Sequence, residues 1–164
     1  MTTSRPPVAF LGIGLMGSRQ ATRLLQAGYR LTAWNRSRSK AEALAPLGAV
    51  VVEDPGQAVA DADVVVLMLE NGTIVREVLF GGGGVAKALR PGTIVVDMSS
   101  IKPAEAQDHA GRLAGRGIHH IDAPVSGGTL GAEQGTLAIM AGGEPDIFAR
   151  IEPLLAVMGR PVHV

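Results

Sequence analysis

Three glycines near the N-terminus constrain this chain more than any other feature. Gly12, Gly14 and Gly17 follow the short apolar run 8–11 in the spacing Gly-x-Gly-x-x-Gly and lead into a helical pattern over 18–26. The first glycine permits a tight turn after a strand, the second lets a backbone approach a ligand, and the third lets helix and sheet pack closely. The unpaired N–H groups at the start of such a helix suit phosphate groups. The segment therefore predicts the strand, turn and helix of a dinucleotide-binding fold, with a cofactor-binding turn made of Gly12, Ile13, Gly14, Leu15, Met16 and Gly17.

Apolar strands and helical segments alternate through the rest of the 164 residues. Hydrophobic residues make up 46% of the chain and aromatic residues only 3%, so the core must consist mainly of Ala, Val, Leu and Ile. The segment 62–69 is nearly all apolar, as in a central strand that is buried on both faces. We therefore expect an α/β fold of the Rossmann type, a doubly wound, mostly parallel sheet with helices on both faces. One domain is expected to span 1–164.

Composition and charge argue against several classes of function. The formal net charge is zero and no basic run stands out, which argues against nucleic-acid binding. The chain has no cysteine, so neither a disulfide framework nor a thiolate nucleophile is available. Residues 1–7 lack the apolar core of a signal peptide, and no apolar run reaches membrane-spanning length. We therefore expect a cytoplasmic protein with neither a membrane nor a nucleic-acid partner.

The segment after the second predicted strand indicates which dinucleotide binds. A site for NAD normally has an acidic residue about 20 residues after the glycines, where it binds the ribose 2′-hydroxyl. Here the strand ends in Asn35, Arg36 and Ser37, and the first acidic residue beyond them is Glu42. An arginine and small hydroxyl groups suit a 2′-phosphate, so NADP is favoured, with NAD as the alternative cofactor. In a second interpretation, Asn35 and Ser37 cap a helix over 38–44 and the arginines are solvated; capping and phosphate binding are compatible.

Two further segments are candidate ligand sites. Met68 and Leu69 end the strand predicted over 62–69, at the carboxyl edge where open α/β folds bind ligands. The strand predicted over 117–122 is followed by a hydroxyl group and two exposed backbone N–H groups, at the start of a short helix predicted over 129–134. Together these groups form a site that fits a carboxylate. Its residues are Ser126, Gly127 and Gly128.

Two conspicuous motifs give weaker signals. The glycine run 81–84 could surround an anion, but no strand precedes it, and a flexible connection is the favoured interpretation. His119 and His120 suggest a metal site, but adjacent residues of a strand point to opposite faces, and neither a cysteine nor a further histidine at metal spacing joins them. Two histidines at the edge of a strand are therefore favoured over a metal site.

Taken together, the motifs resemble the β-hydroxyacid dehydrogenase family. That family includes 3-hydroxyisobutyrate dehydrogenase, tartronate semialdehyde reductase and the more distant 6-phosphogluconate dehydrogenases. The resemblance covers essentially the whole chain and rests on the blocks 10–17, 35–37, 97–103 and 122–137. It implies NAD(P)-dependent interconversion of a 3-hydroxy acid and its semialdehyde or keto form. It also implies that Ser126, Gly127 and Gly128 hold the carboxylate of a small-molecule substrate, and that Ser100 lies beside the nicotinamide.

The chain departs from the family pattern in several places. Gln20, Arg23 and Glu70 stand where many members have Met, Asn and Pro, respectively. In the family, the catalytic lysine and an all-helical domain follow a segment that resembles 162–164. The resemblance therefore implies that no catalytic residue lies within this chain, that the chain alone is inactive, and that a longer parent forms a homo-oligomer. Lys102 follows Ser100 closely, but an ordinary surface lysine is the favoured interpretation.

Two other functions compete with the dehydrogenase hypothesis. A non-catalytic module could bind NADP or a small acid without any proton donor. An enzyme of imine-reductase type could use the same fold with a different substrate. The intact block 122–128 argues against the imine substrate.

Overall fold

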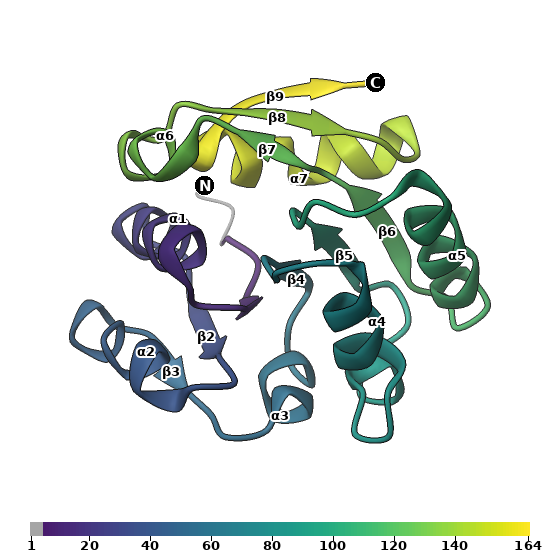
Figure 1. The fold of residues 1–164 in the computed structure, drawn as a ribbon, viewed down its shortest axis with the longest axis horizontal. Coiled ribbons are helices and arrows are strands. Elements are labelled where there is room, and N and C mark those ends of the chain that lie inside the picture. Colours follow the sequence, from purple (N-terminus) through teal and green to yellow (C-terminus); the bar gives the residue numbers. More distant parts are fainter. Residues whose placement is uncertain (1–4) are drawn as a thin grey trace.

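The computed structural model describes residues 5–164 and contains a main sheet of six parallel strands (Figure 1). The strands lie in the order β3-β2-β1-β4-β5-β6. This order confirms the Rossmann-type fold that the sequence predicted. The strands are β1 (Val8–Leu11), β2 (Leu31–Trp34), β3 (Val50–Val51), β4 (Val64–Leu67), β5 (Ile94–Asp97) and β6 (His119–Asp122).

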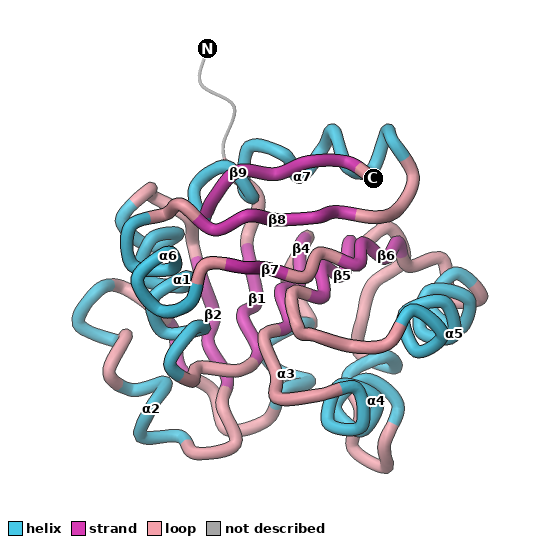
Figure 2. Tube along the Cα trace, turned by 45° about the horizontal axis from the view of Figure 1, so that its top comes forward, coloured by secondary structure: helices cyan, strands magenta, loops and turns pink. Residues whose placement is uncertain are grey.

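Helices cover both faces of the main sheet (Figure 2). Successive side chains of β4 point into the two apolar layers on either side of the sheet. Val66 packs in the cluster that includes α1, whereas Val65 packs in the cluster that includes α4. Within residues 5–164, no helix is both long and apolar enough to cross a membrane. The helices between the strands are α1 (Leu15–Gln26), α2 (Arg38–Glu42), α3 (Pro55–Val59), α4 (Gly72–Phe80) and α5 (Pro103–Ala114), with short 3₁₀ turns at Ala45–Leu47 and Val85–Lys87.

A second, three-stranded sheet follows the main one and was not expected from the sequence. Its strands are β7 (Val125–Ser126), β8 (Leu137–Ala141) and β9 (Gly159–His163), with β7 antiparallel and β9 parallel to β8. Helices α6 (Gly128–Gln134) and α7 (Pro145–Met158) connect these strands, and α6 lies beside α1 (Figure 1). The buried side of β8 joins the same apolar cluster as α1 and α7. The small sheet is thus packed onto the main body of the fold.

Two helix boundaries differ from the expected ones. The first helix begins at Leu15, three residues before the helical pattern was expected to start, because the glycine turn passes directly into it. The helix expected over 38–44 ends at Glu42 and gives way to the 3₁₀ turn. Pro46 contributes to this ending, since it lacks the N–H group that would bond the carbonyl of Glu42 if the α-helix continued.

Arg23 connects three helices whose C-terminal ends meet. From α1, its Nε donates to the carbonyl of Val157 in the last turn of α7 at 2.8 Å, and its Nη1 donates to the carbonyl of Glu133 in α6 at 3.3 Å. The last carbonyls of a helix lack partners within the helix, and a cation is stabilising at that end of the helix dipole. Arg23 therefore holds α6, and the turn that precedes it, against α1.

We predict that Arg23→Met lowers the free energy of unfolding by about 1–3 kcal/mol, because two helix-end carbonyls lose a charged donor. The melting temperature should fall by about 3–8 °C for a chain of this size. Arg19→Met is the matched control on the same helix, since Arg19 bonds only the carbonyl of Leu15 within α1. The control should change stability by less than about 0.5 kcal/mol. Equal effects of the two variants in thermal unfolding would contradict a connecting role for Arg23.

Candidate cofactor site

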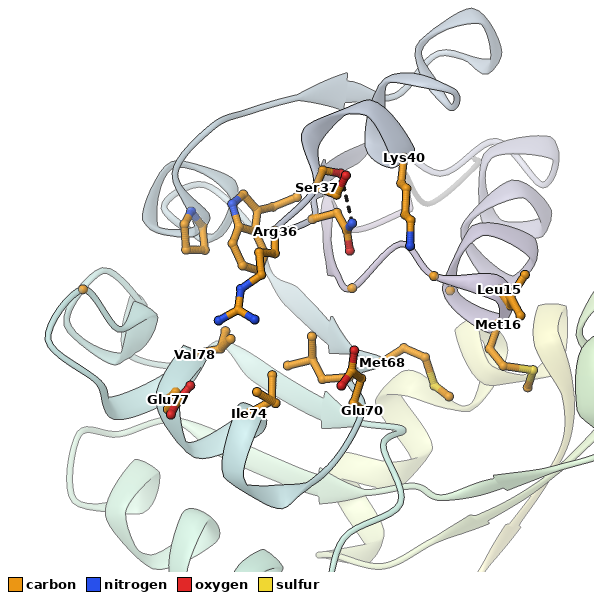
Figure 3. Close-up of a pocket in the computed structure, with 18 residues that line it drawn as sticks. Leu15, Met16, Arg36, Ser37, Lys40, Met68, Glu70, Ile74, Glu77 and Val78 are labelled. Carbon is orange, nitrogen blue, oxygen red and sulfur yellow. Dashed lines mark hydrogen bonds between the residues drawn. The ribbon is translucent and has the colours of Figure 1, made fainter.

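A cavity of about 810 Å³ opens at the carboxyl edge of the main sheet, where β1, β2 and β4 end (Figure 3). Its volume lies in the range of cofactor sites. The connections after β1 and β4 leave the sheet in opposite directions, and ligands of open α/β folds bind at such a switch point. Most residues expected to bind the cofactor line this cavity: Gly12, Gly14, Leu15, Met16, Gly17, Asn35, Arg36, Ser37, Met68 and Leu69.

The three glycines of the turn have different roles in the structure. Gly12 has a φ of +104°, and a Cβ atom there would overlap the carbonyl of Met68. A Cβ atom at Gly17 would overlap the carbonyl of Gly12. Gly14 has a φ of −93°, and a Cβ atom there would meet nothing within 4 Å. The fold therefore requires Gly12 and Gly17, whereas a side chain at Gly14 would only enter the cavity.

Asn35 joins the end of β2 to the glycine turn. Its Oδ1 accepts a hydrogen bond from the backbone N–H of Ile13 at 2.8 Å, and its Nδ2 donates to the carbonyl of Ser37 at 3.0 Å. The Ile13 side chain is buried in the core, so this residue contributes only its backbone to the turn. Ser37 is the N-cap residue of α2, but its side chain makes no capping hydrogen bond. Ser37 thus occupies the N-cap position that the capping interpretation gave it, but neither its side chain nor that of Asn35 makes a capping hydrogen bond to α2.

Two cations face the cavity from the β2 side. Arg36 extends across it toward α4, and Lys40 points from α2 toward the glycine turn (Figure 3). Arg38, by contrast, pairs with Glu42 at 2.9 Å and with Glu53 at 3.0 Å. Among residues 5–164, neither Arg36 nor Lys40 takes part in an ion pair. This side of the cavity thus presents positive charge to a ligand.

Sequence reasoning missed several residues that line the cavity. Lys40 lies four residues after Arg36, and that spacing at the start of a helix could have indicated it. The α4 residues carried no comparable signal, because a helical pattern does not show which of its polar positions faces a cavity. The glycine run also contributes a residue, although it was expected to be only a connection. The residues missed are Trp34, Lys40, Pro55, Glu70, Ile74, Glu77, Val78 and Gly83.

The residues expected to contact the nicotinamide and the substrate lie outside the set that lines this cavity. Ser100 is exposed, just after β5. Ser126, Gly127 and Gly128 are exposed where β7 passes into α6, and the two glycines have φ values of +137° and +63°, which other residues rarely adopt. Lys102 is exposed at the start of α5, where its backbone N–H donates to Glu105 at 2.9 Å. The turn expected to bind a carboxylate is therefore exposed and does not line the cavity.

A buried polar chain joins the turns after β4 and β5. The backbone N–H of Leu69, a cavity residue, donates to Ser99 Oγ at 2.9 Å. The backbone N–H of Ser99 donates to Asp97 Oδ1 at 3.0 Å, and both Asp97 and Ser99 are fully buried. Burial raises the pKa of Asp97 to about 6. The positions of the cavity wall at Leu69 and of the turn that carries Ser100 therefore depend on the same carboxyl group.

The described residues show no grouping of histidine, aspartate and glutamate side chains able to hold a metal ion. His119 and His120 occupy successive positions of β6, so their side chains point to opposite faces of the sheet. Burial lowers the pKa of His120 to about 4, so this imidazole is neutral at physiological pH.

Comparison with known proteins gives a consistent assignment. The family model of the NAD binding domain of 6-phosphogluconate dehydrogenase matches residues 7–164. The 2-hydroxy-3-oxopropionate reductase of Escherichia coli is 40% identical over 155 residues, which are 94% of this chain and 53% of that enzyme. The structure of Mycobacterium tuberculosis 3-hydroxyisobutyrate dehydrogenase with L-serine has a TM-score of 0.93 and 35% identity, over 98% of this chain and 54% of that one.

An imine reductase has the same fold with lower sequence identity. The structure of the Myxococcus stipitatus enzyme with NADP+ has a TM-score of 0.90 and 29% identity, over 97% of this chain and 55% of that one. The chain thus spans about half the length of the relatives that it matches. The matched residues include the glycine turn, the end of β2 and the turn before α6. The chain belongs to the NAD-binding domain family of 6-phosphogluconate dehydrogenase, and it is an NAD(P)-binding domain homologous to those of the β-hydroxyacid dehydrogenases.

Proposed function

We propose that this domain binds NADP in the cavity at β1, β2 and β4 and presents it for hydride transfer with a small 3-hydroxy acid or its semialdehyde. The observation that carries the proposal is the end of β2. Arg36 and Lys40 face the cavity there and, among residues 5–164, pair with no carboxylate, whereas a site for NAD has an acidic residue at this place. The acidic cavity residues, Glu70 and Glu77, come from the β4 and α4 side instead. NAD remains the alternative cofactor.

The residues of the cavity fit the parts of this cofactor. Gly14 leaves room for the pyrophosphate beside the N–H groups that begin α1, and the first turn of α1 contains no acidic residue. Arg36, Ser37 and Lys40 can bind the 2′-phosphate through charge-assisted hydrogen bonds. Bound NADP would supply the hydride chemistry, while this chain binds and orients the cofactor.

The substrate proposal rests on the turn before α6. We assign the substrate carboxylate to the Ser126 hydroxyl and the backbone N–H groups of Gly127 and Gly128, which stand exposed in a conformation that favours glycine. The reductase from Escherichia coli is named for a small carboxylic acid of the same kind. This turn favours a hydroxy acid over the substrate of an imine reductase, although the imine reductase fold is nearly as similar, with a TM-score of 0.90 against 0.93.

The relatives are about twice as long as this chain, so cofactor binding and the remaining functions of such an enzyme can lie in different domains. We propose that residues 1–164 form one cofactor domain, and that a catalytic lysine and the walls of the substrate pocket come from a further helical domain. The longer protein is proposed to be a homo-oligomer. Ser100 is assigned to the nicotinamide end of the site. Within the described residues, Lys102 is exposed and outside the cavity, so it is not assigned as the proton donor.

We predict that Arg36→Ala weakens NADP binding by about 1.5–3 kcal/mol, because a charge-assisted contact with the 2′-phosphate is lost. Binding of NAD should change little. The matched control is Arg38→Ala, since Arg38 already pairs with Glu42 and Glu53 and should leave NADP affinity nearly unchanged. Calorimetric titration of both cofactors measures these effects. Equal losses for NADP and NAD would contradict the assignment of Arg36.

We predict that Gly14→Val abolishes binding of both cofactors while the domain stays folded, because the new side chain would occupy the space needed by the pyrophosphate. Gly111→Val is the control, since a Cβ atom at that exposed position of α5 also meets nothing within 4 Å. Circular dichroism and thermal unfolding check the fold, and calorimetry checks binding. Survival of binding in a folded Gly14→Val variant would place the pyrophosphate elsewhere.

We predict that the 164-residue chain binds NADP but turns over a hydroxy acid at least about 10²-fold more slowly than a full-length relative, because the proposal assigns general acid catalysis and the substrate pocket walls to a further domain. The assay compares the chain with the Escherichia coli reductase on the substrate of that enzyme. Comparable turnover would mean that this chain supplies the proton itself. In that event Lys102→Ala should abolish the activity.

A further inference from the structure

Two carboxylates lie side by side where β5 and β6 end. Asp97 is paired with Asp122 in the parallel register of these strands, so both side chains project from the same face of the sheet. Asp97 is fully buried and Asp122 is partly buried. Within residues 5–164, Oδ2 of Asp97 and Oδ1 of Asp122 are both buried and have no hydrogen-bond partner in the protein. Such atoms are rare in folded proteins and call for a physical explanation.

The charged surroundings of Asp97 favour its neutral form. Burial has the largest effect and raises its pKa, and the nearby carboxylates Asp122 on β6 and Glu105 on α5 raise it further. Hydrogen bonds from Ser99 act in the opposite direction but are outweighed. Burial also raises the pKa of Asp122. Within residues 5–164, neither Asp97 nor Asp122 forms an ion pair that could compensate for burial.

The histidines of the same layer do not supply a positive charge. His120 lies on the β6 face that carries Asp122, and His109 projects from α5 onto Phe80 with ring centroids 5.7 Å apart. Burial lowers the pKa of both imidazoles, so both are neutral near pH 7. The arginines of this region, Arg76 on α4 and Arg112 on α5, act on His109. Among the described residues, the groups that act on the Asp97 carboxyl are therefore Ser99 and two further carboxylates, Asp122 and Glu105, and none of them is a cation.

We propose that Asp97 and Asp122 share one proton at mildly acidic pH, with Asp97 Oδ2 donating to Asp122 Oδ1, and that this pair positions the turns that carry Ser100 and Ser126. A single proton would satisfy both buried oxygen atoms at once. Oδ1 of Asp97 would stay free to accept from the backbone N–H of Ser99, as it does in the structure. Two carboxylates held close together cannot easily both ionise, which is why such pairs retain a proton.

The pair lies at a junction of several segments. The Asp97 side chain accepts a hydrogen bond from the backbone N–H of Ser99, and its backbone carbonyl accepts one from the N–H of Ala123 at 2.7 Å. Asp122 is joined to Gly142 by two backbone hydrogen bonds of 3.0 and 2.7 Å, which tie the end of β6 to the end of β8. The turn that follows Ser99 and the turn that leads to Ser126 thus both start at this pair. The positioning role rests on the proposed function, whereas the shared proton does not.

The shared proton can be observed directly by a ¹³C NMR titration of the aspartate carboxyl carbons in the 164-residue chain. We expect the signals of Asp97 and Asp122 to shift together with one apparent pKa near 6, because the upper titration of a coupled pair belongs to both members. Asp97→Asn should remove this titration from the Asp122 signal. Independent titration of the two signals, or ionisation of Asp97 with an ordinary pKa near 3.8, would overturn the proposal.

Substitutions test whether the pair supports the fold as proposed. Asp97→Asn keeps the acceptor for Ser99 and places an N–H donor where the shared proton lies, so its melting temperature near pH 7 should match or exceed that of the wild type. Asp97→Ala removes both the acceptor for the Ser99 N–H and the donor to Asp122, so it should lower the melting temperature by at least about 5 °C. Asp108→Asn is the control for charge removal on α5, since that side chain is 58% exposed and should have little effect. Equal losses in Asp97→Asn and Asp97→Ala would overturn the proposal.

The pH dependence of stability gives a second readout. The folded pair holds more protons than the unfolded chain between about pH 4 and 6, so this pair makes the protein less stable as the pH rises through that range. Asp97→Asn should lose this effect. The buried histidines act in the opposite direction, because their neutral folded forms are disfavoured as the pH falls. They are the same in both proteins, so the difference between wild type and Asp97→Asn isolates the carboxyl pair; an identical pH dependence in both would overturn the proposal.

Cofactor titration separates this proposal from the proposed function. Asp97→Ala should weaken NADP binding about tenfold by displacing the Ser99 turn and Leu69, whereas Asp97→Asn should stay within about twofold of the wild type. If the two aspartate signals titrate together but the wild type does not bind NADP, the proposed cofactor site is wrong and the shared proton is still supported. NADP binding that is equally strong in all three proteins would overturn the positioning role.

Discussion

The close approach of three backbone segments at the first glycine turn is the constraint on which the rest of the structure depends. Gly12 lies so close to the end of β4 that a Cβ atom would overlap the carbonyl of Met68, and Gly17 lies equally close to Gly12 itself. The N–H of Gly12 donates to the carbonyl of Trp34 at the end of β2, and Asn35 holds the next N–H of the turn. A side chain at either required glycine would separate β1 from α1 or from β4, and with them the two halves of the sheet.

The cavity is a consequence of that packing and of the strand order. Because the chain turns toward β2 after β1 but toward β5 after β4, the loops at their carboxyl ends diverge, and a hollow remains between them. The turn itself is closed by Gly12 and Gly17, so only Gly14 leaves open space on the cavity side. The same motif therefore satisfies a packing requirement with two of its glycines and a ligand requirement with the third.

The sequence predicted the parts of this site that depend on local chemistry. The glycine spacing, the polar end of β2 and the apolar strand before Met68 were sufficient to identify one βαβ unit and most of the cavity lining. The role of Asn35 could not be predicted, because its partner, the N–H of Ile13, is 22 positions away. Nor could the second sheet, since strand propensity does not specify which sheet a strand joins. The pairing of Asp97 with Asp122 likewise depends on register, which only the folded sheet defines.

Charge is distributed unevenly along the carboxyl edge of the main sheet, and this distribution suits a dinucleotide. Beside β2, Arg36 and Lys40 line the cavity and form no ion pair within the described part of the chain, so they can neutralise phosphate groups. Beside β5 and β6 the polar groups are buried carboxyls, and phosphates would be repelled there if both of them were ionised. A protonated pair removes one of these charges and leaves hydroxyl and backbone N–H groups at the surface of the same turns. Under the proposed function, the nicotinamide end of the cofactor and a single substrate carboxylate would lie at that end, whereas the phosphate groups of the cofactor would lie at β1 and β2.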